Sequence, residues 1–225
     1  AQPILYLLAF LLAFGTLLGD ESNQVPYVLF PITGLLVWSY FSFCMQQSGS
    51  ALIRSQEIIR KAYFPRIILP VSKSVVGLID LLVTIVLLIS TLIFLNIGFQ
   101  FEWLITLGFL LASICLSVGV GLVVSILSVR YRDIQHLVPL ATHILLFVSP
   151  IAYPSAIVVD RLPQSISWLY YLNPLAGLID GIRWSVFGEV VNVSGVILGL
   201  CVSALMLLIG LILFSKFDAK LADDI

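Results

Sequence analysis

The residues able to do chemistry are few in this chain, and five of its 23 charged side chains gather in one polar stretch. Of 225 residues, 60% are hydrophobic and only 10% are charged. The charged side chains between residues 54 and 66 are Arg54, Glu57, Arg60, Lys61 and Arg66. Charge of both signs at this density is suited to docking a partner; the alternative is a solvated loop whose cations only fix membrane topology.

Catalytic and metal-binding patterns do not accompany this stretch. The sequence has no Gly-x-x-x-x-Gly-Lys phosphate loop, no His-Glu-x-x-His and no Gly-x-Ser-x-Gly. His136 and His143 stand seven residues apart, but a metal site would need further ligands that the sequence does not supply. We therefore predict no metal site and no covalent catalysis, and we expect these histidines to make hydrogen bonds between helices or to lie at a membrane edge.

Two further charged sites lie outside the polar stretch. Asp80 is surrounded by apolar residues, where a carboxylate is costly unless it is paired or hydrated. It predicts either a structural hydrogen bond or ion pair, which we favour, or part of a substrate or proton pathway. Asp180 and Arg183 have the spacing of a helical ion pair, which would matter only if it were buried or touched a ligand.

The elements that must position these residues are membrane helices. The mean hydropathy of +1.14 excludes a soluble globule. Apolar runs predict an all-α protein with six transmembrane helices, at about residues 3–19, 27–46, 67–95, 103–128, 136–152 and 195–214. No linker or internal repeat divides residues 1–225, so we expect a single transmembrane domain.

The basic residues predict the orientation of these helices. In a six-helix arrangement, nine of the 11 Lys and Arg residues fall on one side, and Arg161 and Arg183 fall on the other. The positive-inside rule then places both termini and the polar stretch in the cytoplasm. Because the charges are sorted by membrane side, we expect no nucleic-acid partner. The chain begins without Met, so we expect that a cytosolic leader precedes it.

The segment from residue 153 to 194 is too long for a hairpin and too broken for a span. Pro154 and Pro163 bound a predicted loop, followed by a short run over residues 164–172. Asn173 and Pro174 are typical of an N-cap and first helical position, so a second short helix is predicted from there to about Gly188. These two helices are expected to be re-entrant or interfacial, before the last span.

The polar stretch itself predicts a short amphipathic helix. It would run from about Ser50 to Ala62 and stop before Pro65. Such a helix is joined directly to a membrane span, and its charged side chains could bind in a cleft of a partner protein. It could therefore transmit a movement of that partner to the membrane helices.

Several short motifs, in order along nearly the whole chain, carry a resemblance to a known family. They are Leu52-Ile-Arg54, Lys61-Ala-Tyr63-Phe64-Pro65-Arg66, Arg130-Tyr-Arg132-Asp133-Ile134, Ser149-Pro150-Ile-Ala-Tyr153, and Asn173-Pro174 followed by Arg183. The chain resembles the membrane (permease) subunit of type-2 ABC exporters, and most resembles the permeases that export O-antigen, capsular and teichoic-acid polysaccharides.

The resemblance implies a bacterial inner-membrane permease that is not itself an enzyme. It would pair with a second copy of itself and with two ATP-binding cassette subunits, which would hold ATP and Mg, so this chain would carry no cofactor. Its cargo would be a lipid-linked polysaccharide, and membrane lipids would surround the chain. The family's amphipathic cytosolic helix before the first span is absent from this sequence. The residues implied to couple the chain to the ATPase are Arg54, Glu57, Arg60, Lys61, Tyr63, Phe64, Arg66, Arg132 and Asp133.

A polysaccharide path would use aromatic rings, because sugars stack their C–H faces on them while their hydroxyls stay wet. The aromatic residues that we assign to this path are Trp38, Tyr40, Phe147, Tyr153, Trp168, Tyr170 and Tyr171. Packing against lipid, or a belt that anchors the fold in the membrane, is the alternative use of such residues.

Three other functions remain open from the sequence. The first is a type-2 exporter of teichoic acid, drugs or lipids. The second is a polytopic membrane enzyme acting on isoprenoid-linked sugars, which would need clustered acids or a nucleophile near one membrane face. The third is a passive channel, whose flux would persist without nucleotide.

Overall fold

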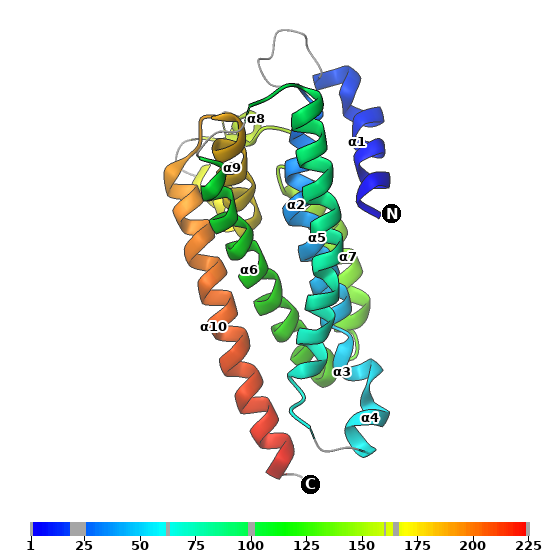
Figure 1. The fold of residues 1–225 in the computed structure, drawn as a ribbon. Coiled ribbons are helices and arrows are strands. Elements are labelled where there is room, and N and C mark those ends of the chain that lie inside the picture. Colours follow the sequence, from blue (N-terminus) through cyan, green and yellow to red (C-terminus); the bar gives the residue numbers. More distant parts are fainter. Residues whose placement is uncertain are drawn as a thin grey trace.

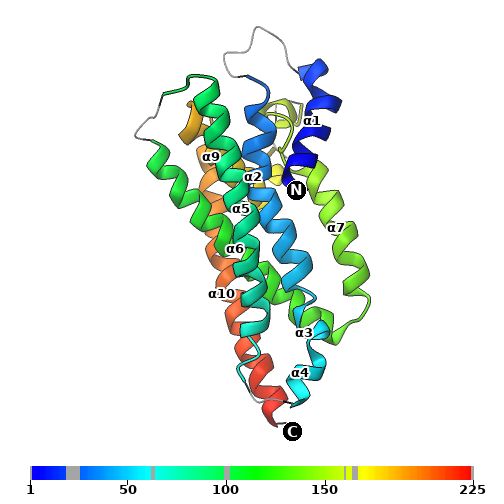
Figure 2. The same cartoon turned by 45° about the vertical axis from the view of Figure 1, so that its right-hand side comes forward.

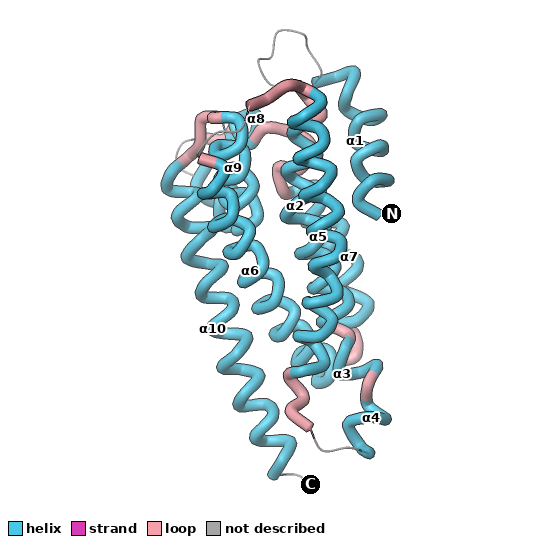
Figure 3. Tube along the Cα trace, in the orientation of Figure 1, coloured by secondary structure: helices cyan, strands magenta, loops and turns pink. Residues whose placement is uncertain are grey.

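The computed structural model describes residues 2–18, 26–61, 64–98, 102–159, 161–163 and 167–223. Within these ranges the chain forms helices and loops, without a strand (Figure 3). The all-α prediction is confirmed for the part of the chain that the structure describes.

The helices follow the predicted apolar runs closely. In chain order they are α1 (Gln2–Leu18), α2 (Leu29–Phe43), the π-helix η1 (Cys44–Ser48), α3 (Ala51–Arg54), α4 (Gln56–Lys61), α5 (Ile68–Phe94), α6 (Trp103–Arg130), α7 (Ile134–Val148), α8 (Ser155–Val159), the 3-10 helix η2 (Ser167–Leu172), α9 (Pro174–Phe187) and α10 (Val193–Asp223).

The long helices lie side by side in an elongated bundle (Figures 1 and 2). The helices α3 and α4 and the last turns of α10 lie at one end, which we name the α4 end. The helix α8 lies at the opposite end, which we name the α8 end, and α9 packs near it against α2, α6 and α10. The helix α1 packs against α2 and α5.

Four of the described helical segments are long and apolar enough to cross a membrane: Leu29–Ser48, Ile68–Phe94, Trp103–Arg130 and Val193–Asp218. The helices α1 and α7 are apolar but shorter. A crossing of about 30 Å takes roughly 20 residues, so helix length alone supports four crossings. The count of six stays a prediction.

The end signals of α9 are the ones that the sequence predicted. The Asn173 side-chain oxygen accepts a hydrogen bond from the Leu175 N–H at 3.2 Å, and Pro174 occupies the first turn. Gly188 ends the helix with φ of 70°, a left-handed conformation that favours glycine.

Two short elements differ from the predictions. Of the helix expected over residues 164–172, residues 167–172 form the 3-10 helix η2, and residues 164–166 lie outside the described ranges. The loop expected after Pro154 contains the five-residue helix α8. The amphipathic helix expected over residues 50–62 is divided into α3 and α4 at Ser55, whose φ and ψ of −109° and 16° leave the helical region. Leu52 is buried against Leu122 and Phe214, which fixes α3 to the bundle and lets α4 take its own direction.

Small residues let α6 and α10 approach closely, and these two helices make the most extensive contact in the fold. A Cβ added at Gly119 would lie 2.5 Å from the Met206 backbone, and one at Gly210 would lie 2.7 Å from the Gly119 carbonyl oxygen. The hydrophobic effect does not drive helices together in a membrane, because lipid tails are as apolar as the side chains. Close van der Waals packing of this kind holds the helices together instead. The glycines therefore set the distance between these helices.

We predict that Gly119→Ala destabilises the chain by about 1–3 kcal/mol, because the new methyl group must push α10 away. Gly108→Ala on the same helix is the matched control, since a Cβ there meets nothing within 4 Å. Thermal unfolding of the detergent-solubilised full-length protein measures the difference. Equal unfolding temperatures for the two variants would contradict the tight contact.

Candidate functional site

A polar cavity of about 110 Å³ lies among α1, α2, η1, α5 and α7. Its lining residues are Tyr6, Trp38, Ser39, Ser42, Phe43, Gln46, Gln47, Asp80, Thr142, His143 and Leu146. Hydroxyl, amide, imidazole and carboxylate groups thus converge between helices that are otherwise apolar. Polar groups in this position are costly unless they are paired or hydrated, which marks the cavity as a candidate site.

A second cavity of about 120 Å³ adjoins the first toward the α4 end. The two share Gln46 and Gln47, and the second adds Arg54 from α3 and Gln135 from α7. The Arg54 guanidinium donates to the Gln47 side-chain oxygen at 3.1 Å. A polar lining therefore continues from α3 into the bundle.

The π-helix η1 positions the two shared glutamines. Its wide turn is closed by the Gly49 N–H donating to the Cys44 carbonyl, five residues back, at 3.3 Å. The Gln46 amide approaches Thr142 Oγ1 of α7 at 3.4 Å, and the Ser48 and Ser74 hydroxyls are 2.9 Å apart. A π-turn inside an α-helix is frequent at functional sites, because it turns side chains that a regular helix would place elsewhere.

The Asp80 side chain faces the first cavity. Its backbone carbonyl accepts from the Thr84 hydroxyl at 2.9 Å, but its carboxylate has no hydrogen bond or ion pair with any residue that the structure describes. The favoured structural partner is thus not found within the described ranges. The carboxylate can therefore interact with a molecule that occupies the cavity.

The two histidines do not meet. His143 lines the first cavity, and its Nδ1 donates to the Pro139 carbonyl oxygen of the same helix at 2.6 Å, whereas His136 lies at the start of α7 and is not among the lining residues; both side chains are exposed. Among the described residues no group of three or more His, Cys, Asp or Glu side chains is arranged to hold a metal ion.

The predicted coupling residues lie at the α4 end, as far as the structure describes them. Glu57 and Lys61 are exposed on α4, Arg132 and Asp133 are exposed in the turn before α7, and Phe64 is half-buried. Tyr63 and the Arg60 side chain lie outside the described residues. Their common location agrees with a docking surface, and their role in coupling stays a prediction.

The loop after α4 is tied to the last helix. Arg66 Nη1 donates to Asp218 Oδ1 of α10 at 3.4 Å, across 152 residues of sequence. Leu52, Leu122 and Phe214 form a buried cluster beside this pair. The segment from α3 to α5 is therefore anchored to both α6 and α10.

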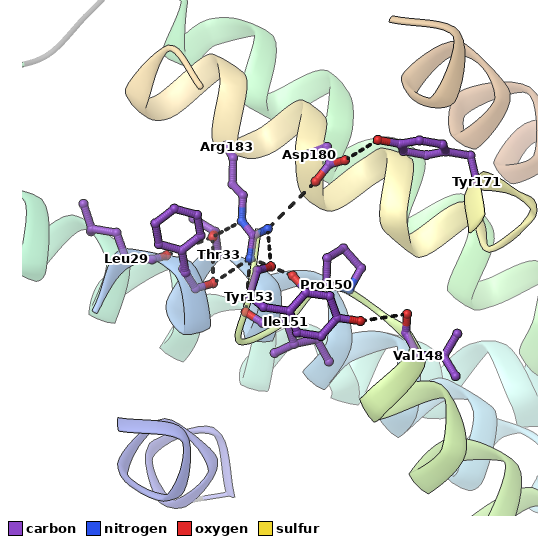
Figure 4. A network of polar contacts seen from close by, with 10 residues as sticks. Leu29, Thr33, Val148, Pro150, Ile151, Tyr153, Tyr171, Asp180 and Arg183 are labelled. Atoms are coloured by element: carbon purple, nitrogen blue, oxygen red, sulfur yellow. Dashed lines mark hydrogen bonds and ion pairs between the residues drawn. The ribbon is translucent and has the colours of Figure 1, made fainter. Parts of the chain in front are cut away.

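A buried network around Arg183 organises the α8 end (Figure 4). The Arg183 side chain is 0% exposed, and its guanidinium lies 4.9 Å from the centre of the Phe30 ring. It donates to the carbonyl oxygens of Phe30, Pro150, Ile151 and Tyr153 at 2.6–3.2 Å, and to Thr33 Oγ1 at 3.4 Å. One side chain of α9 thereby holds α2 and the nonhelical segment that follows α7.

Asp180 completes this network. It lies 3.8 Å from Arg183 and accepts from the Tyr171 hydroxyl at 3.2 Å. Burial raises the pKa of Asp180 and lowers that of Arg183, while the attraction between the two opposes both shifts. The pair that the sequence suggested is thus buried, and its many hydrogen bonds offset the cost of removing both charges from water.

The aromatic residues assigned to a substrate path are not gathered in one place. Trp38 lines the first cavity, whereas the buried Tyr40 packs at Gly77. Phe147 is 68% exposed and Trp168 is 56% exposed. The other three lie by the Arg183 network. Tyr171 donates to Asp180, the Tyr170 ring packs edge-on against the Tyr171 ring, and Tyr153 donates to the Phe147 carbonyl. Their assignment to a path stays a prediction.

Sequence reasoning missed most of the cavity lining. Ser39, Ser42, Gln46, Gln47 and Thr142 were not singled out, although Gln46-Gln47-Ser48 is a polar run at the end of an apolar span. That run was the available signal, because polar residues inside membrane helices rarely face lipid.

A family match places the chain in a class of membrane transport proteins. The model of the ABC-2 type transporter family matches residues 1–187, and the chain belongs to this family. The resemblance to the membrane subunit of type-2 ABC exporters is thereby confirmed.

The chain is similar to curated permeases of O-antigen export. The O-antigen export system permease protein RfbA of Klebsiella pneumoniae is 27% identical over 225 residues, which cover 99% of this chain and 84% of that protein. A second Klebsiella pneumoniae protein of this name is 26% identical with the same coverage. The Myxococcus xanthus protein RfbA is 26% identical over 79% of this chain and 67% of its own length.

We predict that Arg183→Met destabilises the chain by about 3–5 kcal/mol, because it leaves Asp180 without its cation and several buried carbonyls without a donor. Arg161→Met is the matched control, since Arg161 is exposed and should change stability by no more than about 0.5 kcal/mol. The stability of each variant is measured as the loss of monodisperse protein on heating. Equal stability of the two variants would show that the network does not hold the α8 end.

Proposed function

We propose that this chain is the transmembrane subunit of an ATP-driven exporter that moves lipid-linked polysaccharide of the O-antigen type across the bacterial inner membrane. A separate subunit binds ATP with Mg and hydrolyses it. The assembly contains two copies of this chain and two ATP-binding cassette subunits.

The observation that carries this proposal is the pair of adjoining polar cavities. They bring Asp80, Gln46, Gln47 and several hydroxyl groups into the interior of an apolar bundle, in a chain that belongs to a transporter family. Hydrated polar surface between membrane helices is the environment that a hydrophilic cargo needs. The names of the relatives supply the cargo, an O-antigen polysaccharide.

We assign contact with the ATPase subunit to the α4 end. Helix α4 exposes Glu57 and Lys61, and the turn before α7 exposes Arg132 and Asp133. Residues 1–225 contain no phosphate loop, and we propose that a partner subunit supplies the energy.

We propose that the ATPase subunit displaces helix α4, and that this displacement reaches the cavities through short connections. Helix α4 follows α3 directly, and Arg54 of α3 is hydrogen-bonded to Gln47, which lines both cavities. The pair of Arg66 and Asp218 links the loop after α4 to α10. A displacement of α4 would thus move the cavity wall and the last helix together.

The proposed topology has six crossings, with the α4 end in the cytoplasm. Basic residues at this end are Arg54, Lys61, Arg66, Lys73, Arg130, Arg132 and Lys216, as the positive-inside rule requires. The chain from α8 to α9 would be a re-entrant or interfacial cap on the outer side, and membrane lipids would surround the four long helices.

Co-purification tests the partnership. The full-length chain, tagged and extracted in mild detergent from its own cells, is expected to bring with it a stoichiometric ATPase subunit and nucleotide hydrolysis. A chain that is purified intact under these conditions without an ATPase would contradict the exporter assignment and favour a channel or a membrane enzyme.

We predict that Glu57→Arg uncouples the two activities. Reversing this exposed charge should weaken the contact with the ATPase, so that export falls on the order of tenfold while hydrolysis persists. Surface polysaccharide and ATP hydrolysis are measured on the same variant. Glu102→Arg, an equivalent change before α6 near the α8 end, is the control and should leave both unchanged. Normal export in the Glu57 variant would return α4 to the role of a membrane-anchoring loop.

A further inference from the structure

We propose that the first cavity is a saccharide-binding subsite that favours neutral over anionic sugar units, and that Asp80 is its specificity-determining residue. The inference rests on the proposed function, since it describes what part of a polysaccharide this site accepts. It adds a property that neither the family nor the names of the relatives contain: discrimination by charge.

The charge of the cavity is one-sided. Its described lining contains the Asp80 carboxylate and the His143 imidazole, whose Nδ1 is engaged by the Pro139 carbonyl, but no lysine or arginine. The nearby cations are not among its lining residues: Arg54 lines the adjoining cavity and is bonded to Gln47, and Lys73 is exposed about two helical turns along α5. An anionic sugar entering the cavity would meet a carboxylate without a compensating cation.

The Asp80 carboxylate is available to a ligand. It makes no hydrogen bond or ion pair within the described part of the chain, although two hydroxyl-bearing neighbours, Ser39 and Thr84, lie close to each other at 3.5 Å. A carboxylate accepts hydrogen bonds at both oxygens, so it can take up two hydroxyl donors. Neutral sugars present such donors on adjacent ring carbons.

The rest of the lining suits the same ligand. The side chains of Gln46 and Gln47 both donate and accept, as sugar hydroxyls require, and Ser42 adds a further hydroxyl. Trp38 and Tyr6 supply aromatic surface for the C–H face of a ring. None of these groups is specific for one sugar, so the site can accept successive units of a chain.

The surroundings make the carboxylate effective. Repulsion between two like charges is stronger between apolar helices than in bulk water, because the effective dielectric constant is lower. We expect discrimination of about tenfold against a sugar that carries a carboxylate, which corresponds to about 1.4 kcal/mol at 25 °C. Teichoic acids carry a phosphate in each repeat, so the same repulsion would act against them.

The test compares two matched probes on the full-length transporter with its ATPase subunit. The α-1,4-linked galactose tetrasaccharide and tetragalacturonate differ only in a hydroxymethyl group or a carboxylate at C6. Binding of each is measured by calorimetry on the wild type, Asp80→Asn, Asp80→Lys and the control Glu102→Gln. Glu102 is exposed near the α8 end and lies outside the cavity.

We expect the wild type and Glu102→Gln to bind the neutral probe about tenfold more tightly, Asp80→Asn to bind both within about twofold, and Asp80→Lys to prefer the anionic probe. Equal binding of both probes by the wild type, unchanged preference in Asp80→Asn, or binding of neither probe would overturn the proposal. Export of polysaccharide and co-purification of the ATPase are scored separately. A complex that exports its polysaccharide but shows no Asp80-dependent preference refutes this inference and leaves the proposed function intact.

Discussion

The arrangement of the bundle depends on a single buried cation. Arg183 has no access to water, and every donor it carries must find an acceptor inside the protein. The carbonyl groups of Pro150, Ile151 and Tyr153 belong to a nonhelical segment, so they need hydrogen-bond donors from elsewhere in the protein, and Arg183 supplies them. Because the same guanidinium also bonds to Phe30 and to Thr33 of α2, the end of α7 is fixed relative to α2 and α9.

This constraint extends to the candidate site. Helix α7 contributes Thr142, His143 and Leu146 to the first cavity, and α2 contributes Trp38 and Ser39. These two walls are joined at the α8 end by the Arg183 network and at their other end by the contact between Gln46 and Thr142. The Arg183 network and the proposed ATPase contact thus lie at opposite ends of the bundle, which suits a subunit that is driven from one side.

Much of the fold could be predicted from the sequence, because membrane helices are encoded by long apolar runs. Helix α5, predicted at about residues 67–95, is observed at Ile68–Phe94, and the caps of α9 at Asn173 and Gly188 follow local rules. Arg183 and Asp180 could be recognised as a local pair for the same reason. Their partners could not, since Thr33 lies 150 residues from Arg183 in the chain.

The site was harder to predict because it depends on side-chain direction and on long-range packing. The π-turn that places Gln46 and Gln47 is a small change in helix geometry without a local sequence signature. The break at Ser55 lies three residues after Leu52, which is buried against α6 and α10. Whether Asp80 would find a partner depended on which helices face α5, and a single sequence does not specify that.

The central claim, ATP-driven movement of polysaccharide through this subunit, is tested most directly by transport in sealed proteoliposomes. They would contain the full-length chain and its ATPase subunit, with lipid-linked polysaccharide on the ATPase side and a glycan-binding lectin trapped inside. We predict that the trapped lectin becomes occupied only when hydrolysable ATP is added, and that the glycan is chemically unchanged. Transfer without nucleotide would indicate a channel, a covalently altered glycan would indicate a membrane enzyme, and either result would contradict the account.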